Sequence, residues 1–238
     1  MIHTAVKTFA SSWFPRAYEH ELAKETHINR ALRLFGANSG YVEVGVRDGA
    51  CIRQIHAHRK YAIDPAPVAA ENIESDGTRL FKMESDTFFA GHATQAFESQ
   101  PVHVALVDGL HEFEQALRDI LNLERIMRPN GMIFVHDCNP PSREHAEDPN
   151  GAWNGDVWKV VYYLRHYRQD LRLVTLDCDW GLGVISRLSI SAPPVIAESV
   201  ARVAALDYNV LAADRQGVLN LKSPLSFIPF LLGRRIAA

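Results

Sequence analysis

The sequence predicts an α/β fold in which a doubly wound, mostly parallel sheet of seven strands has helices on both faces. Strand and helix patterns alternate for five rounds, which is typical of a parallel sheet built from crossover connections. The strand segments are nearly continuous apolar runs, as expected for strands that are buried on both sides. The last two strand segments lie close together in the sequence, which predicts an antiparallel hairpin at one edge. These features describe a Rossmann-like sheet.

The strands are predicted from short runs of apolar and β-branched residues that are bounded by Gly, Pro or charged residues. They cover residues 41–45, 60–64, 79–83, 102–108, 132–136, 171–176 and 183–186. The clearest of them is Val-His-Val-Ala-Leu-Val-Asp at 102–108, an almost unbroken apolar run that ends in an acid.

Helices are predicted where apolar residues recur among charged ones. They cover residues 16–35, 50–58, 86–99, 112–127, 157–167 and 195–213. Residues 137–156 are rich in Pro, Asn, Gly and charge, which predicts a long loop, and an irregular apolar tail is expected at the end of the chain. We expect a single domain over 1–238, with a helical extension at 1–39, a cofactor-binding core at 40–188 and a helical and apolar extension at 189–238.

The composition is that of an ordinary globular protein, with 47% hydrophobic and 22% charged residues among 238. The net charge of −3 gives no general attraction for polyanions, so nucleic acid is not an expected partner. Cys51, Cys138 and Cys178 lie far apart, which favours a reducing cytoplasm over a disulfide framework. We expect no signal peptide, and the apolar residues 227–232 are too few to span a membrane. That segment and the N-terminal helix are the surfaces expected to form a homodimer or a higher homo-oligomer.

The ends of the first two strands point to a ligand that contains a nucleoside. Gly45 and Gly49 follow the first strand, where backbone can approach a ligand closely, and Asp64 ends the second strand. In a sheet of this type an acid at that position accepts hydrogen bonds from ribose hydroxyls. A turn glycine and a capping Asp are the alternative explanation of the same pattern.

The turn after the first strand favours S-adenosylmethionine over a dinucleotide. A dinucleotide site uses Gly-x-Gly-x-x-Gly, whereas here the middle glycine is missing and Val46, Arg47 and Asp48 form the turn. The acids Asp48 and Glu43 would repel a pyrophosphate but suit a ligand with a sulfonium and an ammonium group. We therefore expect this cofactor to contact Glu43 and the turn residues Gly45, Val46, Arg47 and Gly49, with a nicotinamide-dependent oxidoreductase or epimerase as the alternative.

Polar side chains also follow the fourth and fifth strands. Asp108 and His111 come after one, and His136, Asp137 and Asn139 come at the end of the next. Because the strands are neighbours, these side chains should converge beside the cofactor. Asp108 and Asp137 offer the hard oxygen donors that Mg²⁺ or Mn²⁺ prefers, and such an ion could orient a substrate hydroxyl. His111 is placed to act as the base that removes a hydroxyl proton.

Four segments resemble class I S-adenosylmethionine-dependent methyltransferases that act on small molecules. They are Glu-Val-Gly-Val-Arg-Asp-Gly at 43–49, Ser-Asp-Thr-Phe-Phe at 85–89, Val-Asp-Gly-Leu-His-Glu-Phe at 107–113 and Pro-Asn-Gly-Met-Ile-Phe-Val-His-Asp at 129–137. Over roughly residues 40–186 the chain resembles the metal-dependent sugar O-methyltransferases of macrolide biosynthesis and the related cephalosporin hydroxylase-like proteins.

The resemblance implies a role for each matching residue. Cofactor contacts are implied for Glu43, Gly45, Asp64, Asp108 and Ser85 or Asp86. Metal binding is implied for Asp108 and Asp137, and the base role for His111. The chain departs from the metal-dependent relatives at His136, where they have an acid. An imidazole can ligate a metal, but it suits transition metals better than Mg²⁺, and His136 could equally lie in the core or contact substrate.

The acceptor is expected to be a small hydroxylated molecule. The loop after the fifth strand contains Trp153-Asn-Gly-Asp-Val-Trp158, and aromatic rings beside Asn and Asp suit a polar, ring-shaped acceptor such as a sugar. Acceptor contacts are expected for Trp153, Asp156 and Trp158, and for Asn139 near the start of the loop. Packing of the same loop as a lid is the alternative. Residues 177–180, between the last two strands, are a second candidate for acceptor contact, with a simple hairpin turn as the alternative. The sequence thus predicts O-methylation, against a non-catalytic cofactor-binding protein that would need no base.

Overall fold

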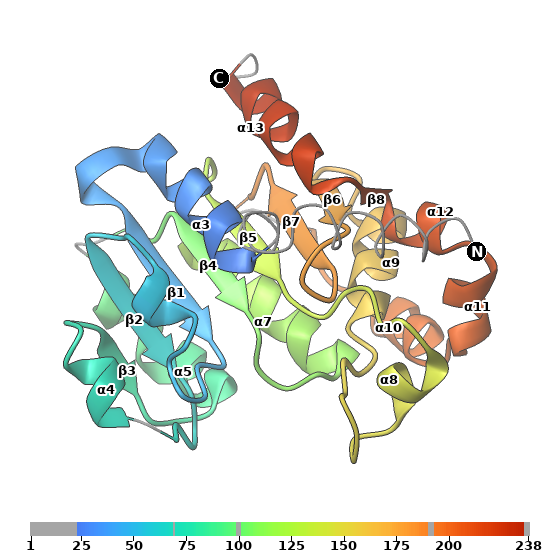
Figure 1. Ribbon diagram of the computed structural model, residues 1–238, viewed down its shortest axis with the longest axis horizontal. Coiled ribbons are helices and arrows are strands. Elements are labelled where there is room, and N and C mark those ends of the chain that lie inside the picture. Colours follow the sequence, from blue (N-terminus) through green and yellow to red (C-terminus); the bar gives the residue numbers. More distant parts are fainter. Residues whose placement is uncertain (1–22, 69, 99–100, 190–192, 236–238) are drawn as a thin grey trace, which may run out of the picture.

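The computed structural model describes residues 23–68, 70–98, 101–189 and 193–235, and these form one eight-stranded sheet. The strands lie in the order β3-β2-β1-β4-β5-β7-β6-β8 (Figure 1). Their bounds are β1 Gly40–Val44, β2 Arg59–Ile63, β3 Arg79–Phe81, β4 Val104–Val107, β5 Met132–Val135, β6 Arg172–Leu176, β7 Leu182–Ser186 and β8 Leu221–Lys222. Only β7 is antiparallel to its neighbours, β5 and β6.

The predicted doubly wound sheet with a C-terminal antiparallel hairpin is confirmed. The predicted number of strands is wrong, because β8 adds an eighth strand beside β6. Two residues are too few to show the alternation or the apolar run by which a strand is recognised in a sequence. The strand forms because the turn before it, which contains Asn220 in a left-handed conformation, brings it to an open sheet edge.

Helices cover both faces of the sheet (Figure 1). Their bounds are α3 Lys24–Leu32, α4 Ala70–Glu74, α5 Ser85–Gly91, α6 Ala93–Phe97, α7 Phe113–Ile126, α8 Arg143–Glu147, α9 Trp158–Tyr167, α10 Ala197–Ala204, α11 Tyr208–Ala213, α12 Arg215–Leu219 and α13 Phe227–Arg235. On one face α3 and α13 pack Ile28 and Phe227 against β5 and β7. On the other face α7 and α9 pack Leu117 and Val160 against β4 and β5.

Several predicted helices differ from the observed ones. Residues 50–58 form a turn and the 3₁₀ helix Ile52–Gln54, and the next residues are held extended because the His56 amide donates to the Asn29 side chain. The helix predicted at 86–99 is divided into α5 and α6 at His92. The helix predicted at 195–213 is divided into α10 and α11, where Asp207 caps the second piece.

Two segments that were predicted to be irregular contain helices. The loop at 137–156 includes α8, whose start is capped by the Ser142 hydroxyl, and the C-terminal tail contains α12 and α13. The first part of the helix predicted at 16–35 lies outside the described residues. Its remainder is α3, followed by the 3₁₀ helix Arg33–Asn38.

The topology determines where a ligand can bind. The chain proceeds from β1 to β2 and β3 on one side, and then crosses to β4 and β5 on the other side of β1. The helices on either side of β1 therefore diverge, which opens a crevice beyond the carboxyl ends of β1 and β4.

Candidate functional site

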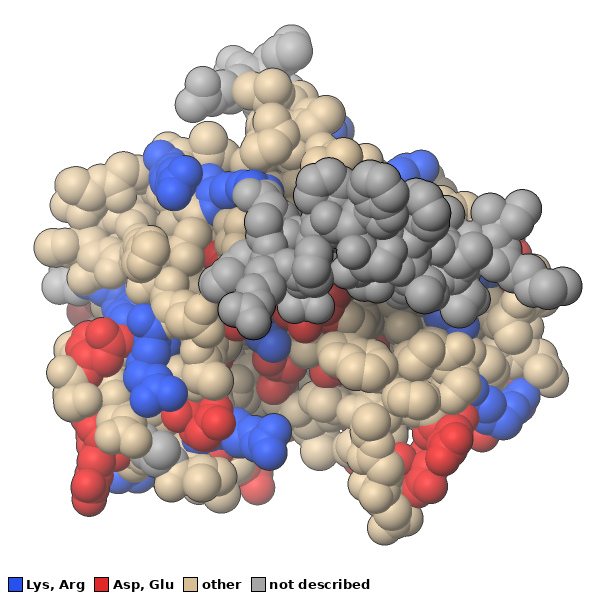
Figure 2. Space-filling view, in the orientation of Figure 1, with Lys and Arg blue, Asp and Glu red and all other residues tan. Residues whose placement is uncertain are grey.

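A cavity of about 810 Å³ lies beyond the carboxyl ends of β1, β2, β4 and β5. Its lining comes from the strand ends and the loops that follow them, from the start of α5, from one residue of α3 and from two residues of α7. The lining residues are 43–48, 50–51, 63–65, 84–86, 108–111 and 136–137, together with Lys24, Gln115 and Asp119. Figure 2 shows acidic and basic side chains side by side in a hollow near the middle of one face.

The turn after β1 requires glycine at Gly45. This residue has a φ of 83°, and a Cβ atom on it would lie 2.2 Å from the backbone oxygen of Asp108. Without a side chain, β1 and the end of β4 approach each other closely at the floor of the cavity. Gly49 is also left-handed, but it is buried and faces Ile73, so it packs the turn and does not line the cavity.

Asp64 holds this turn in place. Its Oδ2 atom accepts hydrogen bonds from the amides of Val46 and Arg47, each at 2.8 Å, and its Oδ1 atom accepts from the amide of Ala66 at 2.8 Å. A carboxylate can accept about four hydrogen bonds, so one site on Oδ1 is left for a ligand hydroxyl. Asp64, the predicted acceptor for the ribose hydroxyls, thus lines the cavity, and backbone amides already occupy three of its hydrogen-bond-accepting sites.

Glu43 lies beneath the turn and is only 1% exposed. Burial raises its pKa to about 8, although the Tyr41 hydroxyl, which donates to Glu43 Oε2 at 2.7 Å, opposes this shift. Glu43 is therefore largely uncharged at neutral pH. An uncharged Glu43 does not repel a pyrophosphate, whereas Asp48 is exposed on the turn and remains the acid that disfavours one.

The start of α5 forms another wall of the cavity. Ser85 and Asp86 both line it, and the Gln115 side chain of α7 donates to Ser85 Oγ at 3.1 Å and to Asp86 Oδ1 at 3.3 Å. The same amide reaches Asp119, and burial raises the pKa of Asp119 to about 6. Both predicted cofactor contacts are thus held at the cavity by α7.

His111 is fixed between two loops. Its Nδ1 atom lies 2.8 Å from the carbonyl oxygen of Trp153, and its Nε2 atom lies 3.2 Å from Asp137 Oδ2. The carbonyl can only accept, so we assign the proton to Nδ1. Gly155 packs so closely on the backbone of His111 that a Cβ atom there would overlap the His111 oxygen. The loop of Trp153 therefore sets the orientation of the imidazole.

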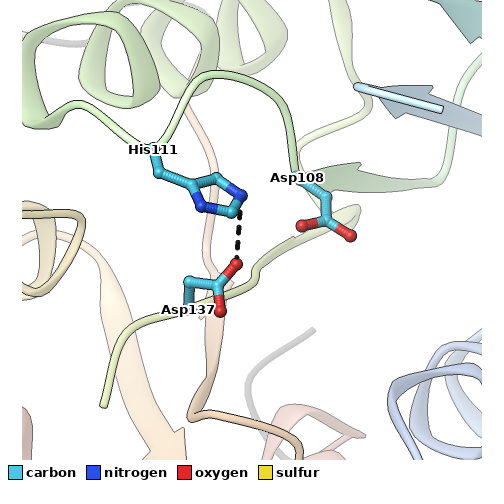
Figure 3. Close-up of side chains that lie close together, drawn as sticks. All are labelled: Asp108, His111 and Asp137. Atoms are coloured by element: carbon cyan, nitrogen blue, oxygen red, sulfur yellow. Dashed lines mark ion pairs between the residues drawn. The ribbon is translucent and has the colours of Figure 1, made fainter. Parts of the chain in front are cut away.

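Asp108, His111 and Asp137 point toward one another (Figure 3), and one ligand atom from each lies within 4.8 Å of the others. The sequence prediction that these three residues converge is confirmed by this placement. The side chain of Asn154 donates to Asp137 Oδ1, and Asp137 itself has a φ of 60°. A non-glycine residue rarely adopts this conformation, which is typical of functional sites held by their surroundings.

His136 lies among three carboxylates. Its Nδ1 atom is 3.0 Å from both Asp108 Oδ1 and Asp137 Oδ2, and its Nε2 atom is 3.5 Å from Asp179 Oδ1. Burial alone would lower the pKa of His136, but Asp108 and the other carboxylates outweigh it and raise this pKa well above its ordinary value. Burial alone would raise the pKa of Asp108, but His136 and Lys24 outweigh that effect and lower this pKa.

Lys24 completes this cluster of charges. Its Nζ atom lies 3.2 Å from Asp108 Oδ2, and its backbone amide donates to Asp179 Oδ2 at 3.0 Å. Burial would lower the pKa of Lys24, and the two aspartates outweigh that effect and raise it. The cluster joins the start of α3, the ends of β4 and β5, and the hairpin between β6 and β7 (Asp179).

The cluster is a poor fit to a divalent metal. Asp108 and Asp137 supply suitable oxygens, but the Nδ1 atom of His136 lies between them and contacts both. The second oxygen of Asp108 contacts the Lys24 ammonium, which would repel a cation. A metal that bound both aspartates would have to displace both positive groups.

The predicted acceptor residues have other partners. Trp158 begins α9 and is 1% exposed in the core, so its predicted contact with an acceptor is wrong. Asp156 accepts from the Phe113 amide at 2.6 Å, which caps α7. Asn139 bonds to the side chains of Asp177 and Arg215. Trp153 is the one of the four that reaches the site, because its carbonyl contacts His111 and its ring lies 5.6 Å from the imidazole.

Lys24, Gln115 and Asp179 are among the residues of the site that were missed in the sequence. Lys24 and Gln115 lie on helices whose patterns carry no motif, so no local signal distinguishes them from surface residues. Asp179 lies in the 177–180 segment, which was considered only for acceptor contact or as a hairpin turn. Asp179 has a φ of 44°, a left-handed conformation that non-glycine residues rarely adopt and that its sequence does not predict.

The sheet, the crevice at its switch point and the glycine turn are features typical of domains that bind a nucleoside-containing ligand. Residues 36–138 match the family model described as a methyltransferase domain. This segment runs from the end of the first 3₁₀ helix to just after β5. Among the described lining residues, all except Lys24 fall within it.

Solved structures with a similar chain trace include three methyltransferases. N-methyltransferase NodS from Bradyrhizobium japonicum WM9 has 18% identity, covers 71% of this chain and 95% of its own, and has a TM-score of 0.49. An rRNA methylase from Streptococcus thermophilus has 13% identity, covers 69% and 94%, and has a TM-score of 0.45. An O-methyltransferase family protein from Burkholderia thailandensis has 12% identity, covers 67% and 53%, and has a TM-score of 0.46. No curated protein matches the sequence.

Within the described parts of the chain, no helix has both the length and the apolar character needed to cross a bilayer.

Proposed function

We propose that this chain uses S-adenosylmethionine to methylate a hydroxyl group of a small acceptor, such as a sugar unit or another natural product. One observation carries the proposal: His111 and Asp137 face each other in the cavity, next to the glycine turn of β1. The match of residues 36–138 to a methyltransferase domain supports the class of reaction. An oriented imidazole favours an enzyme, because a protein that only binds the cofactor needs no base.

The order of the strands suggests how the cofactor lies. Its adenine would contact Ser85 and Asp86 after β3, and its ribose would donate to Asp64 after β2. The methionyl part would then cross Gly45 toward Asp108 at the end of β4. The acceptor would enter beside His111, at the β5 side of the cavity. In this arrangement the cofactor and then the acceptor follow the strand order β3-β2-β1-β4-β5 across the cavity.

His111 supplies the base in this proposal. The bound cofactor supplies a methyl group made electrophilic by its sulfonium. Because Nδ1–H donates to the Trp153 carbonyl, Nε2 carries the lone pair that takes the acceptor proton. The acceptor oxygen would bond to the methyl carbon as the bond from that carbon to sulfur breaks, which leaves S-adenosylhomocysteine. Asp137, 3.2 Å from Nε2, then stabilises the imidazolium that forms. The fixed loops keep the acceptor oxygen and the methyl carbon close and aligned.

A divalent metal remains a separate prediction for the same site. Three possible ligand atoms within 4.8 Å of one another favour it, and the contacts of His136 and Lys24 disfavour it. The proposal therefore assigns the orientation of the acceptor to the protein's own side chains and uses no metal in the reaction.

The mouth of the cavity suits an acceptor with both apolar and polar faces. Leu110 lines the cavity and is 51% exposed. Trp180 is 47% exposed and follows Asp179, which contacts the lining residue His136. Trp180 stacks on His145 at 5.7 Å. A sugar ring presents C–H groups on one face and hydroxyls at its edge, which complements such aromatic surfaces beside acids.

We also propose a homodimer or larger oligomer, which sedimentation would test.

Binding and turnover together test the proposal. Calorimetry should detect binding of S-adenosylhomocysteine and much weaker binding of NAD⁺. With radiolabelled S-adenosylmethionine and a panel of hydroxylated sugars and phenols, the enzyme should form labelled product and S-adenosylhomocysteine. Tighter binding of NAD⁺ would identify a dinucleotide protein. Cofactor binding without product, across acceptors that include amines, would favour a protein without this activity.

A further inference from the structure

Lys24 occupies a distinctive position in the cavity. It is the first residue of α3, its side chain is only 14% exposed, and its ammonium lies 3.2 Å from Asp108 Oδ2. Of the described lining residues it is the one that comes from outside the segment matching the methyltransferase domain. The cavity is therefore completed by a cation from the N-terminal part of the chain.

The charges of the lining show why this cation matters. Eight lining residues carry carboxyl groups, and among the described lining residues only Lys24 and Arg47 have a permanent positive charge. Arg47 is exposed on the turn, where its amide bonds to Asp64 on the β2 side. Lys24 lies instead on the β4 side, beside Asp108. The other positive group at that end, His136, contacts three carboxylates through its two ring nitrogens, so Lys24 is the cation available to an anionic group of a ligand.

We propose that Lys24 binds the α-carboxylate of the methionyl group of S-adenosylmethionine, while Asp108 binds its α-ammonium group. This inference rests on the proposed function, because it takes the methionyl end to lie between β1 and β4. An α-amino acid carries one charge of each sign on neighbouring atoms. The Lys24–Asp108 ion pair offers the two complementary charges at hydrogen-bond spacing.

The position of Lys24 is well fixed. Its backbone amide donates to Asp179 Oδ2 at 3.0 Å, and the following residues Ile28, Ala31 and Leu32 are buried against the sheet. The ammonium group is therefore held at the cavity before a ligand arrives, which lowers the entropic cost of binding.

Three ligands separate this role from a general effect on the site. S-adenosylhomocysteine has both the carboxylate and the amine, decarboxylated S-adenosylhomocysteine keeps only the amine, and 5′-methylthioadenosine has neither. Calorimetry on Lys24→Met should show affinity for S-adenosylhomocysteine lowered about 10- to 100-fold, since a hydrogen bond between charged groups is lost. Affinity for the other two ligands should stay within about twofold of the wild type or rise for the amine.

Lys222→Met is a matched control on an exposed position of β8, and it should leave all three affinities unchanged. An unchanged affinity of Lys24→Met for S-adenosylhomocysteine would overturn the assignment. So would an equal loss for all three ligands, which would indicate a structural role. Failure of the proposed function would appear differently, because the wild-type protein itself would then not bind S-adenosylhomocysteine.

Discussion

The Nε2 atom of His111 lies 3.2 Å from Asp137 Oδ2, and this contact connects the loop after β4 with the end of β5. The other ring nitrogen, Nδ1, donates to the backbone carbonyl of Trp153. Nε2 is therefore the ring atom that can exchange a proton with an acceptor. Both the catalytic proposal and its first test depend on it.

Replacing His111 with Ala should lower kcat about 100- to 10,000-fold, which is the usual contribution of a general base. The affinity for S-adenosylhomocysteine, measured by calorimetry, should be unchanged because the cofactor contacts other residues. His58→Ala, at an exposed histidine, is the control and should retain full activity. A fully active His111→Ala enzyme would exclude the base assignment.

Replacing Gly45 with Ala should disrupt the turn after β1. The left-handed φ of 83° and the contact of 2.2 Å with the Asp108 backbone leave no room for a methyl group, so we expect a loss of about 3 kcal/mol or more in unfolding free energy. Cofactor binding should be lost as well. Gly91→Ala, where a Cβ atom meets nothing within 4 Å at the end of α5, is the matched control, and its unfolding free energy should change by less than about 1 kcal/mol. Equal effects in urea unfolding would contradict the steric argument.

The stability of the protein should depend on pH through Glu43. Its pKa is raised from about 4.5 to about 8 by burial, so the folded state retains a proton that the unfolded state releases between these values. The Glu43 contribution to stability is therefore complete below pH 4.5 and is lost as the pH rises to 8. Glu43→Gln keeps an acceptor for Tyr41 and cannot ionise, so the variant should gain stability relative to the wild type from pH 5.5 to pH 8.5.

Urea unfolding at several pH values gives this difference directly, and titration of other groups cancels between the two proteins. Glu71→Gln, at an exposed position, should show a constant difference over the same range. A constant difference for Glu43→Gln would mean that the buried carboxyl has an ordinary pKa.

Removal of divalent metals should leave turnover unchanged. His136 contacts both Asp108 and Asp137, and Lys24 contacts the remaining oxygen of Asp108. Activity should therefore persist in EDTA. Replacing His136 with Asp adds an oxygen donor and removes a positive group, so this variant should bind Mn²⁺ more tightly by calorimetry. Loss of wild-type activity in EDTA with recovery on adding Mg²⁺ would restore the metal to the mechanism.

A buried ion pair far from the cavity should control stability without affecting activity. Arg168 forms two hydrogen bonds of 2.8 Å to Glu124, and the two residues are 4% and 1% exposed. Glu124→Ala leaves Arg168 with an incomplete set of partners and should cost about 3–5 kcal/mol. The exposed pair of Glu198 and Arg202 is the control, and Glu198→Ala should cost less than about 1 kcal/mol. Thermal unfolding distinguishes the two, and kcat should be normal for both.

The order of the main strands and helices could be predicted because each of them has a recognisable pattern of apolar residues in the sequence. Segments such as 102–108 and 112–127 correspond closely to β4 and α7, since each has the apolar run or the 3.6-residue periodicity of its element. The short elements α4, α8 and β8 could not be predicted, because two to five residues carry too little pattern and are held by tertiary contacts.

The site divides in a similar way. Asp108, His111 and Asp137 could be predicted because strand ends converge in any parallel sheet. Trp158 was assigned to the wrong role because an aromatic residue near a loop is indistinguishable, in sequence, from one that begins a buried helix. Lys24 is 84 residues from Asp108 in the chain, and only the folded packing of α3 reveals their contact.

The sheet order also has a consequence for anyone who wishes to express the core alone. Residues 36–138 end just after β5, whose outer edge is paired with β7 from the later hairpin. A fragment with those limits would leave the apolar β5 as an open edge, with its backbone amides and carbonyls free to pair with other copies. We expect such a fragment to aggregate, so the minimal soluble unit should extend at least through the hairpin.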